Sequence, residues 1–369
     1  MSATVGVDVG GTKLLAVALD EEGRVLAADR ADTPQNLVPG RAATPDDAGG
    51  AEDASVGGSG LVESSPGGIP MSSGALLGAI AGLVRRVTEQ SAAEVSALGV
   101  GVPGLVDDSG VLHFAPNLPM GEGVDFSGGL RAMVGVKRVL IDNDATCATL
   151  GEWSAGAARG ADDALVVTLG TGIGGGLVAA GRLVRGAHGF AGEIGHVVVD
   201  PGGPLCSCGK RGCWERYASG SGLARLAREA ALAGRIEAAV RLAGGDPEAV
   251  RGEHVTRAAA AGDEHAKAVI EELAWWLALG LSNLVSILDP ELVVLGGGLM
   301  SAGDLVLLPT RRSFLELTGA RRARCEVPVV LAALGERAGA VGAALLARHW
   351  HRSDPRLAPG SLPPGPLEP

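Results

Sequence analysis

Short runs of aliphatic and β-branched residues, separated by glycine-rich turns, recur along the chain. Thr4–Val9 and Leu14–Leu19 are two such runs, and the four residues between them are Gly-Gly-Thr-Lys. This pattern predicts a β-hairpin. Leu165–Leu169 and Leu177–Ala180 repeat it on either side of the glycine-rich segment Gly170–Gly176. Because one strand–turn–strand pattern occurs twice, the sequence predicts two related domains.

Other periodic segments predict the remaining elements of secondary structure. Short apolar runs indicate strands, and apolar residues at helical spacing indicate helices. The predicted strands are Leu98–Val102, Val139–Ile141 and Leu292–Leu295; the predicted helices are Ala75–Glu89, Ala145–Trp153 and Ala338–Trp350, with a mostly helical stretch from Leu223 to Leu288. Strands that alternate with helices indicate an α/β fold.

Two segments lack this periodicity. Residues 34–73 are rich in Gly, Ser, Asp, Ala and Pro, and we expect a largely disordered surface insertion because such a composition buries little apolar area. The Pro-rich tail, residues 351–369, is also predicted to be disordered. The rest divides into a smaller α/β domain of residues 1–143 and 336–350 and a larger one of residues 144–335, with a cleft between them.

Composition and charge restrict the classes of partner. The 369 residues suffice for two domains of ordinary size. A net charge of −11 without a basic block argues against nucleic acid as a partner. No uninterrupted apolar run approaches the roughly 18 residues that cross a bilayer, and the N-terminus resembles no signal peptide, so we expect a cytoplasmic protein without a membrane partner. Any anionic ligand must be held by backbone amides and a few cations.

The two glycine turns are candidate phosphate sites. Asp8 is followed by Gly10, Gly11, Thr12 and Lys13, which offers exposed backbone N–H groups beside a carboxylate, and phosphate with its Mg²⁺ suits such a site. Taken alone, this turn is equally consistent with a plain hairpin. The second turn, which contains Gly170, Thr171, Gly172 and Gly174, has the same design. Together the two turns could bind one polyphosphate from opposite sides of a cleft.

Asp144 is the candidate general base. It follows a predicted strand and precedes a predicted helix, a position at which α/β folds present reactive groups. A carboxylate there can accept the proton of an attacking hydroxyl during phosphoryl transfer. The alternative is that Asp144 serves only as the N-cap of the helix.

A cluster of potential zinc ligands follows the second turn. One imidazole and three thiols, from His196, Cys206, Cys208 and Cys213, form a tetrahedral donor set that suits Zn²⁺. Four protein ligands leave no open coordination position, so we expect a structural ion. Glu193 and Glu215 flank the cluster, and such carboxylates can hydrogen-bond a polyol. Cys147 and Cys325 lie outside it and are assigned no role.

These motifs together resemble those of the ROK family (repressors, open reading frames, kinases) of the hexokinase and actin-like superfamily, and within it the bacterial glucokinases. The resemblance rests on Gly192–His196 and on Cys206–Glu215, which match the family pattern at every defining position. It covers nearly all of Thr4–Trp350 outside the insertion, and it implies an actin-like ATPase (ribonuclease H-like) fold with two domains flanking a catalytic cleft.

The resemblance also implies roles for single residues. Asp8–Lys13 and Gly170–Gly176 would be the phosphate loops, and Asp144 would be the catalytic base. Gly296, Gly297 and Gly298 would lie against adenosine. The sugar hydroxyls would be bound by Asn117, Asn143, Asp144, Glu193, His196 and Glu215. One departure is Thr146, where the family usually has Asn.

The implied reaction is in-line transfer of the ATP γ-phosphoryl group, with Mg²⁺, to O6 of glucose. Alternatives are a ROK kinase for N-acetylmannosamine, N-acetylglucosamine, fructose or allose, or a sugar-responsive repressor. Repressors of the family carry a winged-helix segment before the first strand, whereas only Met1–Ala3 precede it here. The phosphoryl donor (ATP or polyphosphate) and the choice between a homodimer and a homotetramer stay open.

Overall fold

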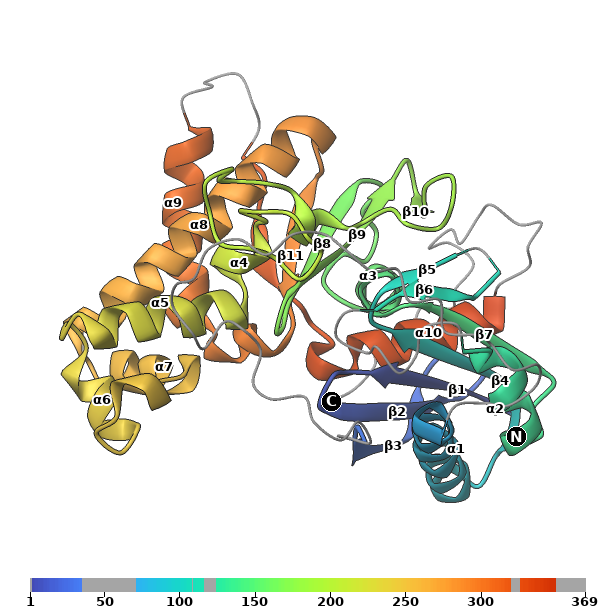
Figure 1. The fold of residues 1–369 in the computed structure, drawn as a ribbon. Helices are drawn as coiled ribbons and strands as arrows, with labels where there is room; N and C mark the ends of the chain where they lie inside the picture. The colour runs from blue at the N-terminus through green and yellow to red at the C-terminus, as the bar shows by residue number, and fades with distance from the viewer. Residues whose placement is uncertain (1, 35–70, 108, 116–123, 320–325, 350–369) are drawn as a thin grey trace, which may run out of the picture.

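The chain is built around two five-stranded sheets (Figure 1). The computed structural model describes residues 2–34, 71–107, 109–115, 124–319 and 326–349. The first sheet has the order β3-β2-β1-β4-β7, and its strands are β1 (Ser2–Val9), β2 (Lys13–Leu19), β3 (Val25–Asp32), β4 (Glu94–Val102) and β7 (Arg138–Asn143). The second has the order β10-β9-β8-β11-β12, formed by β8 (Ala164–Leu169), β9 (Ile173–Ala179), β10 (Arg182–Val184), β11 (Leu292–Gly296) and β12 (Val329–Leu331).

The first sheet is mixed and is covered on both faces. β1 and β2 pair as an antiparallel hairpin, whereas β4 runs parallel to both β1 and β7. Helices α1 (Met71–Ser91) and α2 (Phe126–Val134) share a hydrophobic core with one face. Helix α10 (Ala338–His349) covers the other face so closely that a Cβ on Gly6 would lie 2.8 Å from the Cβ of Ala344. Glycine in the strand is what permits this approach.

Alternate side chains of β8, in the second sheet, point into two different hydrophobic cores, as expected of a strand buried on both faces. Leu165, Val167 and Leu169 of β8 pack into a core with helices α8 (Glu264–Leu288) and α9 (Asp304–Thr318). Ala164 and Val166 point the opposite way, into a core shared with α3 (Asp144–Ala155) and α10. The helices α8 and α9 therefore lie on the outer face of this sheet, and α3 lies on the inner one.

Helices α3 and α10 form the layer between the two sheets (Figure 1). They cross at glycines: a Cβ on Gly342 of α10 would lie 2.9 Å from the backbone nitrogen of Gly151 of α3 and would overlap the carbonyl oxygen of Cys147. α10 packs mainly on the first sheet and α3 mainly on the second, so the two helices join the half of the molecule built on the first sheet to the half built on the second.

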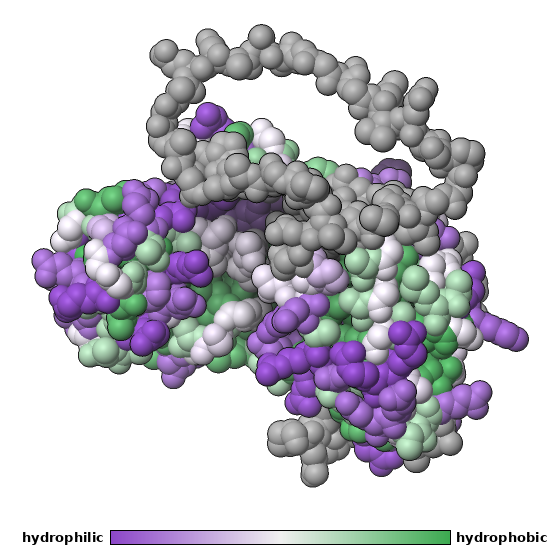
Figure 2. Space-filling view, turned by 60° about the horizontal axis from the view of Figure 1, so that its bottom comes forward, coloured by the Kyte–Doolittle hydropathy of each residue, from purple (hydrophilic) through white to green (hydrophobic). Residues whose placement is uncertain are grey.

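The remaining elements surround this frame. They are β5 (Leu105–Val106), β6 (Leu112–Phe114), α4 (Glu215–Ala218), α5 (Gly220–Leu232), α6 (Glu237–Leu242), α7 (Gly252–Ala260) and the 3₁₀ helices η3 (Ile194–His196), η4 (Pro247–Ala249), η5 (Gly298–Ala302) and η6 (Gly335–Arg337). Within the described ranges, α8 alone is long and apolar enough to cross a bilayer, and 56% of its most apolar window is buried in the fold. Figure 2 shows hydrophilic residues gathered on the outer end of one lobe and along the lower part of the other.

The structure confirms the predicted strands and helices and corrects two boundaries. The glycine-rich segment Gly170–Gly176 is only partly a turn, because β9 begins at Ile173. Residues 71–73, assigned to the insertion, belong to α1. Most of the predicted insertion, the predicted tail and Trp350 fall outside the described residues.

Candidate functional site

The first glycine turn is held at both ends by hydrogen bonds. The Gly10 N–H donates to the Lys13 carbonyl at 2.9 Å, and Thr33 Oγ donates to the Gly10 carbonyl at 2.6 Å. Between these anchors Gly11 and Thr12 are exposed, as an anion site requires. The ammonium of Lys13 lies 2.6 Å from Oε1 of Glu336 in η6, at the start of α10. The structure therefore places this turn at the join between the first sheet and α10.

The second turn consists of Gly170, Thr171 and Gly172. The Gly170 N–H donates to the Gly172 carbonyl at 3.0 Å, while the amides of Gly220 and Ser221 donate to the Gly170 and Thr171 carbonyls at 2.8 and 3.2 Å. Helix α5 thus begins against this turn.

Gly174 is corrected from a loop residue to a strand residue, as are the two glycines that follow it. It pairs with Thr168 of β8, and a Cβ on it would lie 2.7 Å from the Cβ of Ala145 in α3. Glycine is needed here so that α3 can pack against β9. In a sequence, a glycine required for packing looks the same as a glycine required for a turn.

The third glycine segment lies beside the second turn. Gly296 ends β11, and Gly298 begins η5. Gly297 between them has a φ of 85°, and a Cβ on it would lie 2.5 Å from the backbone nitrogen of Leu169, the last residue of β8. Two glycine segments 120 or more residues apart in the chain therefore come together at the ends of neighbouring strands.

The carboxylates of Asp8, in β1, and Asp144, at the start of α3, lie close enough for their charges to repel. Burial raises the pKa of Asp8 to about 7, with Asp144 adding to the increase and Lys13 opposing it. Burial also raises the pKa of Asp144. The hydrogen bond that its Oδ1 accepts from the Ala145 amide at 2.8 Å lowers this pKa and offsets part of the increase. Asp8 is the penultimate residue of β1 and Asp144 directly follows β7, so both groups lie at the carboxyl ends of parallel strands.

The N-cap of α3 is Asn143 rather than Asp144. Asn143 Oδ1 accepts the Thr146 N–H at 2.9 Å, and Asn143 Nδ2 donates to the Gly104 carbonyl at 3.0 Å. Because the neighbouring residue fulfils the capping role, the alternative account of Asp144 loses its basis. Asp144 occupies the first turn of the helix with a carboxylate available for chemistry.

Glu193, His196 and Glu215 form a connected group. Nε2 of His196 lies 3.8 Å from Oε2 of Glu193, and Nδ1 lies 3.6 Å from Oε1 of Glu215. Burial raises the pKa of Glu193; His196 opposes this, and the charges of Asp144 and Glu215 add to it. Glu193 is therefore close enough to the proposed base, Asp144, to feel its charge. Asn117 lies outside the described residues.

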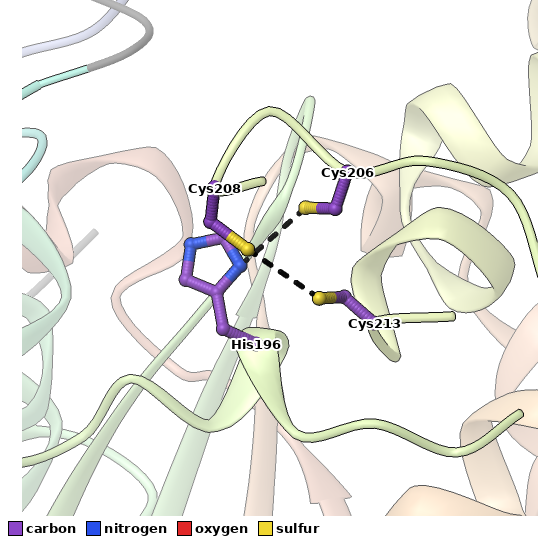
Figure 3. A group of neighbouring side chains, drawn as sticks. All are labelled: His196, Cys206, Cys208 and Cys213. Carbon is purple, nitrogen blue, oxygen red and sulfur yellow. Dashed lines mark hydrogen bonds between the residues drawn. The ribbon is translucent and has the colours of Figure 1, made fainter. Parts of the chain in front are cut away.

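The proposed zinc ligands converge (Figure 3). The ligand atoms of His196, Cys206, Cys208 and Cys213 all lie within 4.8 Å of one another. Nδ1 of His196 is 3.6 Å from Sγ of Cys206, and Sγ of Cys208 is 3.5 Å from Sγ of Cys213. A tetrahedral ion with Zn–S of about 2.3 Å and Zn–N of about 2.0–2.1 Å separates its ligand atoms by about 3.5–3.8 Å, so the group fits Zn²⁺.

One ion pair near Asn143 and Asp144 carries no signal in the sequence. Arg185, directly after β10, binds the carboxylate of Asp142, the residue before Asn143. The two lie 43 residues apart in the chain, and no local pattern marks either of them.

Comparison with known proteins identifies the class. A family model described as "ROK family" matches residues 70–350, and the chain belongs to this family. The fold is accordingly the actin-like ATPase fold of ROK sugar kinases.

Within the family, the chain is similar to several glucokinases. The chain is 37% identical over 356 residues to the glucokinase of Streptomyces coelicolor, covering 94% of this chain and 98% of that protein. It is 33% identical to the glucokinase of Halalkalibacterium halodurans, covering 95% and 96%. A crystal structure of a ROK family glucokinase from Streptomyces griseus, in complex with glucose and AMPPNP, superposes with a TM-score of 0.78 at 36% identity, covering 94% of this chain and all of that one.

Proposed function

We propose that this protein is an ATP-dependent glucokinase that phosphorylates glucose at O6. The observation that carries the proposal is the position of Asp144, whose charge acts both on Asp8 in the first sheet and on Glu193 beside the second sheet. The similarity to glucokinases over nearly the whole chain supports glucose as the sugar and ATP as the donor.

The residues of the site divide between the two substrates. Asp144 accepts the proton of the sugar O6 hydroxyl as that oxygen attacks the γ-phosphorus. Its raised pKa makes it a stronger base than an exposed carboxylate. The turns Gly10–Lys13 and Gly170–Gly172 donate backbone N–H groups to the phosphates, and Gly296–Gly298 lie against adenosine. When bound beside Asp8, Mg²⁺ supplies charge that stabilises the phosphoryl oxygens.

The sugar is held by side chains from both halves. Glu193, His196 and Glu215 hydrogen-bond its hydroxyls, and Asn143 contributes from the first half; the family resemblance adds Asn117 to this set. An amide Nδ2 carries two hydrogens. One of those on Asn143 is donated to the Gly104 carbonyl, and the second can be donated to the sugar.

A structural zinc ion, held by His196, Cys206, Cys208 and Cys213, completes the proposed site. With Nδ1 of His196 turned toward the thiols and Nε2 toward Glu193, the metal would fix both the tautomer and the direction of the imidazole. The enzyme acts in the cytoplasm, where its soluble sugar and nucleotide substrates are found. It acts there as a homodimer or homotetramer.

Replacing Asp144 by Asn tests the central role. Because the amide cannot accept a proton, kcat for glucose should fall by about 100-fold or more, while glucose still binds in a calorimetric titration. Asp162→Asn, at an exposed carboxylate, is the matched control and should keep wild-type kcat. An Asp144→Asn variant that retained more than about a tenth of kcat would show that another group is the base.

A panel of sugars tests the specificity. Glucose, N-acetylglucosamine, N-acetylmannosamine, fructose and allose are compared by kcat/KM, each with ATP and with polyphosphate as donor. We expect glucose with ATP to give the highest value. A higher kcat/KM for another pair would assign the protein to that reaction within the same family.

A further inference from the structure

A buried ion pair joins the two halves of the molecule one residue away from the capped start of α3. Arg185 follows β10 of the second sheet, and Asp142 belongs to β7 of the first. Nη2 of Arg185 donates to Oδ1 of Asp142 at 2.9 Å, and Nη1 donates to Oδ2. The side chains are 14% and 1% exposed. A two-point contact of this kind fixes direction as well as distance, because each carboxylate oxygen faces its own N–H group.

Hydrogen bonds continue from this pair to the residues on either side of the proposed base. Oδ1 of Asp142 also accepts the backbone N–H of Asn143 at 2.8 Å. Asn143 in turn caps α3 through the Thr146 N–H at 2.9 Å. Asp144 lies between these two anchored groups, as the first residue of the helix. The guanidinium of Arg185 therefore holds the backbone from which the Asp144 carboxylate projects.

The segment that carries Arg185 touches the first half of the molecule a second time. The ring of Phe190 meets the ring of His113, in β6, edge-on at a centroid distance of 5.9 Å. Residues 185–190 thus contact the first half at two places. With two contacts the segment cannot pivot about the ion pair alone.

Arg185 also offsets negative charge around the site. Burial raises the pKa of the Cys147 thiol, and the charges of Asp142, Asp8 and Asp144 add to this increase, whereas Arg185 opposes it. These groups therefore share one electrostatic environment. Removing the guanidinium would take one positive charge from a region in which the carboxylates of Asp8 and Asp144 already repel each other.

We propose that Arg185 is a positioning residue for phosphoryl transfer: through Asp142 it holds the end of β7, and with it Asp144, in a fixed place relative to the second half of the molecule. The inference rests on the proposed role of Asp144 as the base. Phosphoryl transfer depends on alignment of the reacting atoms, and a misplacement of about 1 Å can cost about 100-fold in rate.

Arg185→Lys tests the positioning directly. A single ammonium keeps the charge but cannot face both oxygens in the same way, so kcat should fall about 10- to 100-fold. The KM values for glucose and ATP should stay within about threefold, since neither substrate is bound by this pair. Arg182→Lys, at an exposed position of β10, is the control and should match the wild type. Wild-type kcat in Arg185→Lys would overturn the inference.

A double variant separates positioning from folding. Arg185→Met alone removes the cation that faces a buried carboxylate, whereas Arg185→Met combined with Asp142→Asn removes both charges. The double variant should melt within a few degrees of the wild type and yet keep a kcat at least about 10-fold low. If kcat instead recovered together with thermal stability, the pair would be merely structural and the inference would be wrong.

Crystal structures of the wild type and Arg185→Lys give a readout that does not depend on activity. A displaced Asp144 carboxylate supports the inference, and an unmoved one overturns it whatever the kinetics. Absence of hexose phosphorylation by the wild type, by contrast, would refute the proposed function, so the two failures are distinguishable.

Discussion

The crossing of α3 and α10 gives a sharp prediction about stability. A Cβ on Gly342 would lie 2.5 Å from the carbonyl carbon of Cys147. Non-bonded carbons ordinarily approach to about 3.5–4.0 Å, so one helix must move by roughly 1 Å. Both helices are confined between the sheets and share one core, which leaves little room for such a shift. Overpacking of this kind costs about 1–3 kcal/mol, and contact with rigid backbone puts Gly342→Ala at the upper end.

The helix propensity of alanine offsets only part of this cost. Alanine is favoured over glycine within a helix by about 1 kcal/mol. We therefore expect Gly342→Ala to lose a net of about 2 kcal/mol. Because the shift of about 2–4 °C per kcal/mol for 150–250 residues decreases with chain length, the variant should melt below the wild type by roughly 4–8 °C or less.

A matched substitution isolates the effect of packing. Gly78, in α1, is exposed, and a Cβ on it would meet nothing within 4 Å. Gly78→Ala should therefore raise the melting temperature, since only the gain of about 0.5–1 kcal/mol in propensity remains. Calorimetry on both variants and the wild type measures the contrast. If Gly342→Ala melted at or above the wild type, as Gly78→Ala should, the close helix crossing would be refuted.

Two further predictions concern the site itself. Cys208→Ser should lower the zinc content, measured by mass spectrometry, from about one ion per chain and raise KM for glucose more than KM for ATP; full zinc content, or unchanged glucose affinity without zinc, would break the proposed link. Asp8→Asn should raise the melting temperature of the metal-free protein at pH 8, and less at pH 5. Asp8 has a pKa of about 7 in the folded protein against 3.8 ordinarily, so its ionisation destabilises the fold increasingly as pH rises between those values. A difference in melting temperature that did not depend on pH would contradict this.

Much of the fold could be predicted because its strands are regular. In the hairpins around Gly10–Lys13 and Gly170–Gly172, aliphatic runs are interrupted only by turn residues, and both hairpins form as expected. The thiols and imidazole of the cluster could also be predicted to meet, since their short spacing limits how far apart the chain can carry them. Local patterns are sufficient wherever partners lie close in sequence.

Contacts between distant segments could not be predicted in this way. The sequence predicts a turn at Gly174, but the residue lies in β9, where glycine is needed because Ala145 packs against it from another element. The choice between Asn143 and Asp144 as the helix cap depends on one residue of register, which composition does not reveal. The pairing of Arg185 with Asp142 needs the two sheets to be in place first. In each case the deciding information is tertiary.

The helix pair α3 and α10 also links stability to chemistry. Asp144 is the first residue of α3, and a Cβ on Gly339 of α10 would lie 2.6 Å from Cγ of Asp8. Each helix thus contacts or carries one of the two repelling carboxylates, and the glycines at the crossing set how far apart the helices lie. A shift of roughly 1 Å at Gly342 must therefore alter the relation of Asp144 to Asp8. Gly342→Ala should lower kcat even at temperatures where the variant is fully folded, because the base is moved rather than lost.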